Sequence, residues 1–231
     1  MLSSEELCKD VARHSPDVIC SFSMGKDSIA AAIQMQRHFE RVEYVFLYMV
    51  PGLEFQEAQL DYYESKLGKH IKRMPNPSFA RQLNFLTYQP PGNVDMIDSL
   101  GIYGADYDEV FAASKHDFKM SDSAYVGVGV RSADSLARRT SVKQTGGINR
   151  KRKQFFPIHD WDIKRTVSEI RQSGIKLPID YKIWGRSFDG FDHRFLKPLK
   201  DSFPKDYEKI REWFPLVELE LKRYETFDTR K

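Results

Sequence analysis

Short apolar runs alternate with helix-forming segments along the first half of the chain. The apolar runs have little polar interruption, as expected of parallel strands covered on both faces, and lie at residues 17–22, 42–50 and 124–130. Segments with helical length and composition lie at 28–39, 53–68, 78–85 and 107–118, and a short strand is expected at 70–74. Because parallel strands are joined through crossover helices, this order predicts an α/β fold with a doubly wound parallel sheet of about five strands.

The remaining segments frame this pattern. Ser3 and Glu6 fit a capping box, so a first helix is expected from Ser4 to about Arg13. The stretch 88–106 is rich in Pro, Gly and Asp and is expected to be a loop. After Arg131 we expect a basic loop, a helix within 157–174, a glycine-rich turn and a pair of C-terminal helices broken at Pro215. Ligands of such sheets bind beyond the carboxyl ends of the strands, so the loops after those ends are the candidate sites.

Composition narrows the classes of protein. The 231 residues carry 36 Lys and Arg against 33 Asp and Glu, a net charge of +3 that is too small to indicate a polyanion partner by itself. With only Cys8 and Cys20, a disulfide framework, a four-cysteine zinc site and a cysteine-ligated iron–sulfur cluster are excluded. No stretch approaches the roughly 18 apolar residues of a membrane span. We therefore expect a cytoplasmic protein without a membrane partner.

The segment Ser23-Met24-Gly25-Lys26-Asp27-Ser28 stands between the first predicted strand and the helix that follows. Backbone N–H groups at such a helix end favour a bound phosphate. Gly25 lets the backbone approach an anion, Lys26 supplies charge, and the hydroxyls of Ser21, Ser23 and Ser28 are hydrogen-bond donors. Asp27 is a candidate magnesium ligand or a cap for helix-end amides. The alternative is a polar strand-to-helix turn without a ligand.

Other fingerprints do not apply. There is no GxxxxGK[ST] motif, and Gly127-Val128-Gly129 lacks the third glycine of GxGxxG, so an ordinary γ-phosphate kinase is disfavoured. The six histidines show no spacing like HExxH, which makes a zinc site unexpected. Cys8 and Cys20 are expected to be small buried residues of a helix and a strand.

SFSMGKDS resembles the pyrophosphate loop of the ATP pyrophosphatase (PP-loop, adenine nucleotide α-hydrolase-like) superfamily, most closely its phosphoadenosine phosphosulfate (PAPS) reductase family. Three further stretches follow in the family's order. PGLEFQE (51–57) is similar to DTGxEFPET, and GVRSADSLARR (129–139) to GxRxxESxxRR. PIHDW (157–161) and YKIWGRSFDGF (181–191) are similar to PxxDW and YxxGxxxxGC, so the resemblance spans about 18–191.

The resemblance implies a Rossmann-like adenine nucleotide α-hydrolase fold, with a nucleotide-binding domain at 1–199 and a C-terminal helical extension at 200–231. It also implies a site for ATP, or for PAPS or APS, with Mg²⁺ at Asp27. The nucleotide-binding residues that we expect are Ser21, Phe22, Ser23, Met24, Gly25, Lys26, Asp27, Ser28, Tyr48, Glu54, Gly129 and Arg131.

The chain departs from the family pattern at two places. Val50 and Pro51 stand where the family has Asp and Thr, and Phe191 stands where a cysteine commonly follows glycine. Family reductases attack sulfur with a cysteine thiolate, and no C-terminal cysteine is present to do so here. We therefore expect chemistry at the α-phosphate of ATP, with adenylyl transfer and pyrophosphate release.

The expected catalytic residues are Lys26, Asp27, Arg131, Arg138 and Arg139. The arginines follow a central strand, so they are placed to neutralise charge on the α-phosphate and the leaving pyrophosphate. The alternative for them is a solvated helix face with salt bridges. Asp134 and Ser135 are candidate caps of this helix.

Four consecutive cations, Arg150, Lys151, Arg152 and Lys153, end a glycine-containing segment that we expect to be a flexible loop. Such a run attracts polyanions, so it is a candidate to close over a triphosphate or to bind a nucleic-acid backbone. A merely solvated loop is the alternative.

Three functions stay open from the sequence. The first is adenylyl transfer to sulfate, a flavin or a nucleic-acid base. The second is a sulfonucleotide-binding, reductase-like protein that uses the thiol of a partner. The third is a non-enzymatic nucleotide- or nucleic-acid-binding module. A homo-oligomer or a partner protein is compatible with each of them.

Overall fold

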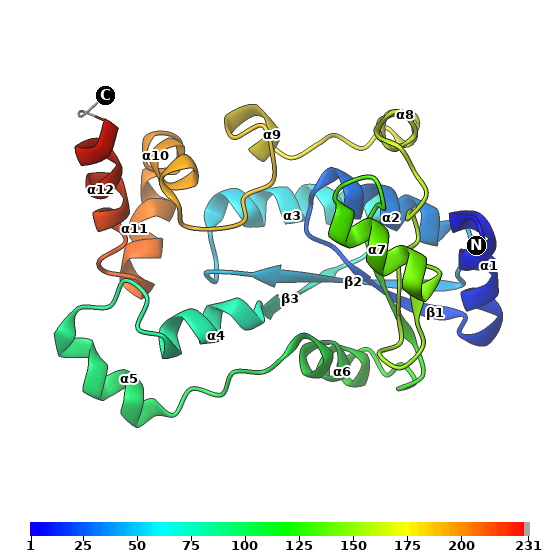
Figure 1. Cartoon of the computed structure of the whole chain (residues 1–231), viewed down its shortest axis with the longest axis horizontal. Helices are drawn as coiled ribbons and strands as arrows, with labels where there is room; N and C mark the ends of the chain where they lie inside the picture. The colour runs from blue at the N-terminus through cyan, green and yellow to red at the C-terminus, as the bar shows by residue number, and fades with distance from the viewer. Residues whose placement is uncertain (229–231) are drawn as a thin grey trace. The chain divides into compact units, whose positions relative to one another are not determined.

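Two compact units make up the computed structural model, which describes residues 1–228 (Figure 1). The first unit comprises residues 1–47, 63–74 and 108–177. The second comprises residues 48–62, 75–107 and the described residues from 178 onward. The boundary that we predict between residues 199 and 200 stays a prediction.

A six-stranded sheet with the order β3-β2-β1-β4-β6-β5 carries the first unit. Its strands are β1 (Asp17–Ser21), β2 (Arg41–Tyr48), β3 (Ile71–Pro75), β4 (Tyr125–Val128), β5 (Ile148–Asn149) and β6 (Gln154–Phe155). β1 pairs in parallel with β2 and β4, β4 pairs in parallel with β6, and the short strands β5 and β6 pair antiparallel. The predicted parallel α/β sheet is confirmed.

Helices cover both faces of this sheet. They are α1 (Ser4–His14), α2 (Lys26–Gln36), α6 (Tyr107–Asp117), α7 (Leu136–Thr145) and α8 (Ile163–Ser173), while α3 (Glu54–Leu67) begins in the second unit and ends in the first. α8 packs on α2, and α6 lies across the opposite face (Figure 1). On the α6 side, Ile19, Val45 and Val126 of three adjacent strands pack with Phe111 in one apolar cluster. The capping box of α1 is confirmed, with Ser3 N donating to Glu6 Oε2 at 2.8 Å.

The strand order creates a switch point at β1. From β1 the chain moves outward through β2 to β3, and it then returns to place β4 on the other side of β1. Ser21 lies opposite both Val45 and Val128, so β1 and β4 end at the same edge. In open α/β sheets, ligands bind outside the carboxyl ends of strands at such a point. The loops after β1 and β4 are therefore the candidate binding loops of this sheet.

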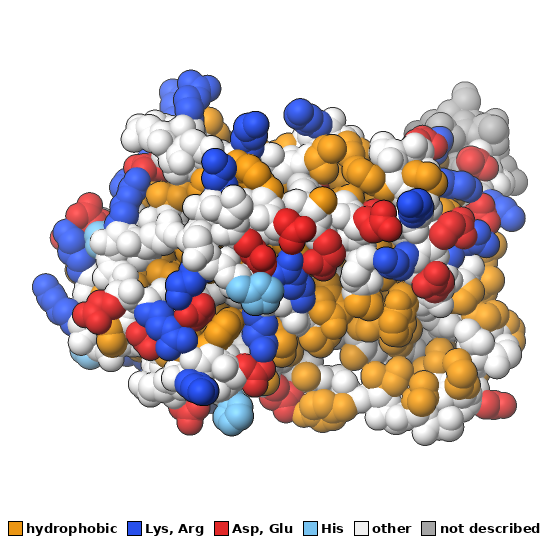
Figure 2. Space-filling model, turned by 180° about the vertical axis from the view of Figure 1, so that it is seen from behind, with side chains coloured by type: hydrophobic (Ala, Val, Ile, Leu, Met, Phe, Trp, Pro, Cys, Tyr) orange, Lys and Arg blue, Asp and Glu red, His pale blue; other side chains and the backbone are white. Residues whose placement is uncertain are grey.

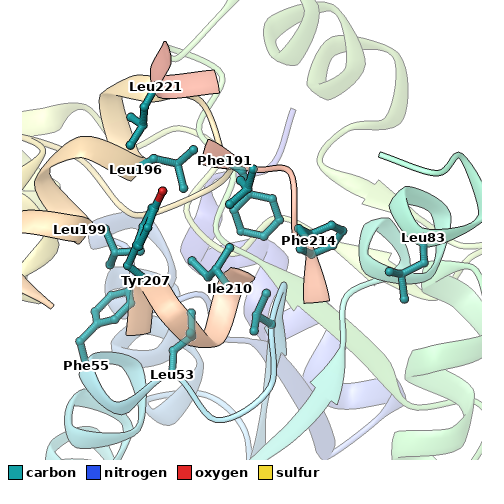
Figure 3. Packing of buried hydrophobic residues seen from close by; sticks show 12 residues of the cluster. Leu53, Phe55, Leu83, Phe191, Leu196, Leu199, Tyr207, Ile210, Phe214 and Leu221 are labelled. Atoms are coloured by element: carbon teal, nitrogen blue, oxygen red, sulfur yellow. The ribbon is translucent and has the colours of Figure 1, made fainter. Parts of the chain in front are cut away.

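An aromatic-rich core holds the second unit together (Figure 3). Its remaining helices are α4 (Pro77–Asn84), α5 (Val94–Leu100), α9 (Asp180–Ile183), α10 (His193–Ser202), α11 (Pro204–Trp213) and α12 (Glu218–Asp228), with the 3-10 turn η1 at Pro91–Asn93. The core residues come from these helices, from the segments between them, and from the start of α3 and the residues just before it. They include Val50, Leu53, Phe55, Leu83, Phe191, Leu196, Leu199, Tyr207, Ile210, Phe214, Val217 and Leu221. Phe191, at the family's cysteine position, packs against Phe214 with ring centroids 5.0 Å apart.

Two expected loops are wrong. The stretch 88–106 contains α5, which is held by the buried side chain of Ile97 and ends at Gly101 in the left-handed conformation (φ 54°). Residues 148–155 form the hairpin of β5 and β6, so the four cations occupy its turn instead of the end of a flexible loop. In both cases tertiary contacts order segments whose turn-forming residues indicate only irregular backbone.

Asp206 joins α11 to the start of α3 within the second unit. This carboxylate is 2% exposed and accepts hydrogen bonds from the backbone N–H groups of Glu54 (2.6 Å) and Phe55 (3.0 Å). It therefore caps α3 from a distant part of the chain, where the first N–H groups of a helix otherwise have no partner. Lys209, one turn later, donates to the carbonyl of Gly52 at 2.5 Å.

The substitution Asp206→Ala should lower the free energy of unfolding by about 2 kcal/mol, because it leaves two buried N–H groups without an acceptor. Urea unfolding followed by circular dichroism measures the effect. Asp201→Ala is the matched control, since Asp201 is exposed and pairs with Lys197 on the surface. Equal stability of the two variants would contradict the capping role.

Candidate functional site

The segment after β1 is a tight turn that leads directly into α2. Met24 has a left-handed backbone (φ 60°) and a buried side chain, which anchors the turn. Gly25 is the N-cap of α2 and has no side chain to accept a helix-end hydrogen bond. The N-terminus of α2 is thus left for another hydrogen-bond acceptor, and the helix dipole favours an anion there.

β4 brings its following loop into contact with this turn. A Cβ atom on Gly129 would lie 2.5 Å from the carbonyl oxygen of Asp27 and 2.7 Å from the backbone nitrogen of Ser28. Only glycine allows this approach, because the atoms it meets belong to the backbone of the first turn of α2. Two of the predicted candidate loops, those after β1 and β4, therefore form one site.

A chain of alternating charges runs through the site. Lys26 Nζ contacts Asp27 Oδ2 at 2.7 Å, and Arg131 Nε lies 2.8 Å from Asp27 Oδ1. This second contact is ionic, since the N–H does not point at the oxygen as a hydrogen bond requires. Arg131 Nη2 reaches Asp134 Oδ1 at 2.5 Å, and Asp134 Oδ2 accepts from Arg138 Nη1 at 2.8 Å.

Burial differs sharply along this chain of charges. The side chain of Arg131 is 6% exposed, whereas that of Arg138 is 48% exposed. Arg131 thus connects the turn between β1 and α2 to the start of α7. Within this chain of charges, Arg138 is the arginine that solvent or a ligand can reach. Asp134 is the residue that sequence reasoning missed, because it was considered only as a cap. The available signal was its spacing: Asp134 lies three residues after Arg131 and four residues before Arg138, and side chains at these spacings can meet.

Other predicted residues fall into distinct positions. Ser28 Oγ donates to the carbonyl of Gly25 at 2.9 Å, so this hydroxyl supports the turn. Ser23 is exposed, Ser21 is half-buried, and Phe22 is buried against Tyr63. Ser135 caps α7 by accepting from the N–H of Arg138 at 3.2 Å, as predicted.

Tyr48 and Glu54 belong to the second unit, and their part in nucleotide binding stays a prediction. Tyr48 ends β2, and burial raises the pKa of its hydroxyl. Glu54 is exposed at the first position of α3. Val50, at the family's Asp position, is fully buried in the core of its unit.

Arg139 and the cationic turn lie apart from the chain of charges. Arg139 is exposed on α7 and has no ion-pair partner within the part of the chain that the structure describes. In the turn, Arg152 forms a bidentate contact with the carboxylate of Asp108, and Arg150 lies 3.6 Å from Asp10. Lys153 lies over the ring of Tyr125, with its Nζ 5.5 Å from the centroid. Three of the four cations are thus engaged by the first unit itself.

Neither cysteine is available as a nucleophile. Cys8 and Cys20 are both fully buried, as expected. Burial raises the pKa of Cys8 to about 12 and raises that of Cys20 still further. The reactive form of cysteine is the thiolate, so neither thiol can supply it near neutral pH.

The residues present do not fit a directly held magnesium ion. Both oxygens of Asp27 already face cations, Lys26 and Arg131. Across residues 1–228, no three His, Cys, Asp or Glu side chains gather in an arrangement that could hold a metal ion.

His159 supports the site from the PIHDW segment. Its carbonyl accepts from Ser132 N at 2.8 Å and from Ser132 Oγ at 2.7 Å, which fixes the residue after Arg131. The ring is 1% exposed, and a Cβ on Gly147 would lie 2.9 Å from it. Burial lowers the pKa of this imidazole, against a smaller opposing influence of Asp160. The imidazole of His159 therefore takes up a proton less readily in the folded chain than in the unfolded chain.

Acid should therefore destabilise the first unit through His159. Below the ordinary histidine pKa of about 6.5, the unfolded chain takes up a proton that the folded chain binds less readily, so stability falls as pH falls. Urea unfolding at about pH 7 and about pH 5.5 measures this slope. His159→Asn should flatten it, whereas His116→Asn, on an exposed side chain, should not. An unchanged slope in His159→Asn would contradict the assignment.

The fold, the switch point at β1 and the N-terminus of α2 together define the class of this protein, which is a Rossmann-like α/β protein. Among solved structures, the chain is similar to phosphoadenylyl-sulfate (PAPS) reductase from Candida auris in its phosphate complex. That likeness has a TM-score of 0.50 at 12% sequence identity and covers 82% of this chain and 88% of the reductase. This likeness confirms the predicted Rossmann-like fold.

A second solved structure is the U34-tRNA thiolase NcsA from Methanococcus maripaludis with its [4Fe-4S] cluster, matched at a TM-score of 0.44 and 12% identity over 93% of this chain and 80% of the thiolase. No protein-family model matches the chain, and no curated protein matches it by sequence. Within residues 1–228, no helix is both long and apolar enough to cross a bilayer.

Proposed function

We propose that this chain is an adenine-nucleotide-binding enzyme that acts at the α-phosphate of ATP, transferring the adenylyl group and releasing pyrophosphate. The observation that supports it most is the N-terminus of α2, which has a glycine N-cap and lies at the switch point beside Gly129 and Arg131. Backbone N–H groups in that position bind phosphate oxygens, and the chain supplies two flanking cations in Lys26 and Arg138.

The residues divide the work between binding and support. In this proposal the turn and Lys26 hold the β- and γ-phosphates of the magnesium complex of ATP. Arg138, with about half of its side chain exposed, swings from Asp134 to the phosphates. Arg131 stays buried between the carboxylates of Asp27 and Asp134 and holds the turn before α2 next to the start of α7. The positive charge of Arg138 then stabilises the negative charge that develops during transfer.

The reaction is a displacement at phosphorus. An oxygen of the acceptor forms a bond to the α-phosphorus with its lone pair. The bond from that phosphorus to the oxygen bridging to the β-phosphate breaks, and pyrophosphate leaves with the electron pair. Sulfate, a flavin phosphate or a nucleic acid supplies such an oxygen. Loss of a hydrogen-bond donor that stabilises the developing negative charge typically lowers the rate about 100- to 1,000-fold.

Incubation with ATP labelled at the α-phosphate, together with each candidate acceptor, tests this proposal. The wild-type protein should give a labelled adenylyl product and an equal amount of pyrophosphate. Lys26→Ala should lower both at least about tenfold, because it removes a charge-assisted phosphate contact. Lys164→Ala, an exposed lysine of α8, is the matched control and should behave as wild type.

Titration calorimetry separates the remaining alternatives. Binding of PAPS without binding of ATP would overturn adenylyl transfer and favour a sulfonucleotide protein, which would need an external thiol because Cys8 and Cys20 are buried. The non-enzymatic module would be favoured instead by a different result: charge reversal of residues 150–153 abolishes nucleic-acid binding, whereas the Lys26→Ala variant still binds nucleic acid as wild type does.

A further inference from the structure

The first unit carries more positive charge than the chain as a whole. Its residues, 1–47, 63–74 and 108–177, contain 23 Lys and Arg against 16 Asp and Glu, a formal net charge of +7 compared with +3 for the full sequence. Seven of these cations fall within residues 135–159, which form α7 and the hairpin of β5 and β6 and contain no Asp or Glu. The excess charge is therefore concentrated in one segment, and such a segment attracts polyanions.

α7 and the hairpin are neighbours in the first unit. α7 packs against β5, to which Gly146 and Gly147 connect it directly. α7 lies at the front of Figure 1, and Val142 is the one buried residue among its ten. Figure 2 shows the first unit from behind, and on that face Lys and Arg side chains lie among Asp and Glu. α7 thus presents an exposed surface that carries charge of one sign.

Three cations of this segment have no carboxylate beside them. Arg139 and Lys143 are exposed and lie four residues apart on α7, so they share one side of the helix. Lys151 is exposed in the hairpin turn. None of the three has an ion-pair partner among residues 1–228. We call these three side chains the basic surface.

Carboxylates from other elements face the rest of the hairpin turn. Asp10 lies 3.6 Å from Arg150, and Asp108 binds Arg152. The two arginine side chains are 63% and 44% exposed, and ion pairs with that exposure contribute about 0–1 kcal/mol. These arginines are partly neutralised, so the basic surface supplies most of the free positive charge.

The uncharged side chains around the basic surface favour nucleic acid over other polyanions. Within residues 135–159, Leu136 is the one large apolar side chain that is exposed. A helix that binds a membrane surface needs an apolar side, and a protein interface needs several large anchors, so neither partner fits. Thr140, Ser141 and Gln144 are exposed on α7, and such hydroxyl and amide groups join Lys and Arg in contacts to phosphate and sugar.

The same stretch favours a duplex over a single strand. No Phe, Tyr or Trp side chain within residues 135–159 is exposed. Proteins that bind single strands stack the bases on aromatic side chains, and this stretch offers none for that purpose. A duplex needs no stacking, because its backbone presents the phosphates.

α7 also connects the basic surface to the candidate site. The helix begins just after Asp134, whose carboxylate contacts both Arg131 and Arg138. Its ten residues span about 15 Å, so a duplex held along α7 lies beside Arg138 and the turn before α2. These elements all belong to the first unit.

We propose that the basic surface binds the phosphate backbone of a nucleic-acid duplex, and that this duplex is the acceptor in the proposed reaction. The acceptor role rests on the proposed function, whereas the binding role does not. An oxygen of the duplex forms the bond to the α-phosphorus, and pyrophosphate leaves with the electron pair of the bond that breaks. Any proton on the attacking oxygen passes to water. Arg139 is thereby assigned to the backbone of the duplex instead of to the phosphates of ATP.

Fluorescence anisotropy with a labelled duplex of about 20 base pairs, either DNA or RNA, tests the binding role without ATP. The wild-type chain should bind at about 50 mM salt and at least about tenfold more weakly at about 200 mM. The tighter of the two duplexes identifies which nucleic acid is the partner. Arg139→Gln with Lys143→Gln should weaken binding at least about tenfold and lower the salt slope by about two, and adding Lys151→Gln should weaken it further.

Lys164→Gln with Arg171→Gln is the matched control. It removes one lysine and one arginine from exposed positions of α8 in the same unit, and it should bind the duplex as wild type does. Equal losses in the two double variants would show that net charge alone matters, which overturns the basic surface. A wild-type chain that binds neither duplex at about 50 mM salt overturns it as well.

ATP labelled at the α-phosphate then tests the acceptor role. The wild-type chain should transfer label to the duplex, and the double variant of α7 should need at least about tenfold more duplex for half of its maximal rate. A duplex that is bound but stays unlabelled, while sulfate or a flavin phosphate accepts label, overturns the acceptor role and leaves the proposed function intact. Failure to release pyrophosphate with every acceptor overturns the proposed function, whereas duplex binding that depends on Arg139 and Lys143 would still support the basic surface.

Discussion

Gly129→Ala should abolish nucleotide binding while the sheet remains folded. The new Cβ would meet the carbonyl oxygen of Asp27 at 2.5 Å and the nitrogen of Ser28 at 2.7 Å. These are backbone atoms of the first turn of α2, so relief requires that the helix end itself move. We expect a loss of affinity of at least about 100-fold for ATP, with a cost of about 1–3 kcal/mol in unfolding free energy from overpacking. Calorimetric titration and urea unfolding measure the two effects.

Gly127→Ala is the matched control, because it makes an equally short contact with a different kind of atom. Its Cβ would lie 2.3 Å from Met35 Sδ, and a flexible thioether can move aside within the core. This variant should lose stability but keep its affinity for the nucleotide. If both glycine variants lost affinity for the nucleotide equally, the close contact of Gly129 with the first turn of α2 would not be the cause of that loss.

Much of the fold was predictable because its signals are local. The run 17–22 followed by a glycine-bearing turn and a helical segment needs no distant contact to be recognised, and β1, the turn and α2 lie where that pattern places them. The resemblance also singled out Gly129 and Arg131. Only the structure gives the physical reason for Gly129, which is its contact with α2.

The remainder depended on contacts distant in sequence. The proline and glycine residues around α5 indicated a loop. The helix forms because Ile97 is buried in the packed second unit, and the local sequence does not reveal that burial. Arg131 was expected to face a ligand, yet the structure buries it between Asp27 and Asp134. Its distance from Asp27 depends on the pairing of β1 with β4, which no local pattern reveals.

Arg131→Met should be among the most destabilising single changes in the first unit. Arg131 is the shared counter-ion of Asp27 and Asp134, whose side chains are only 19% and 16% exposed. Removing the cation from a buried ionic cluster typically costs about 3–5 kcal/mol, and the partial exposure of these carboxylates favours the lower end. Arg131→Lys should recover only part of the loss, since one ammonium cannot reproduce the planar fork that reaches both partners.

A second substitution distinguishes this supporting role from direct contact with phosphate. Adding Asp134→Asn to Arg131→Met removes one uncompensated carboxylate, so the double variant should be more stable than Arg131→Met alone. Urea unfolding without nucleotide measures this coupling free energy. A residue that acted only on the phosphate would show the opposite pattern, with Arg131→Met as stable as wild type and deficient only in turnover. Stability and turnover lost together, with stability partly regained in the double variant, would place Arg131 at the junction between the phosphate turn and α7.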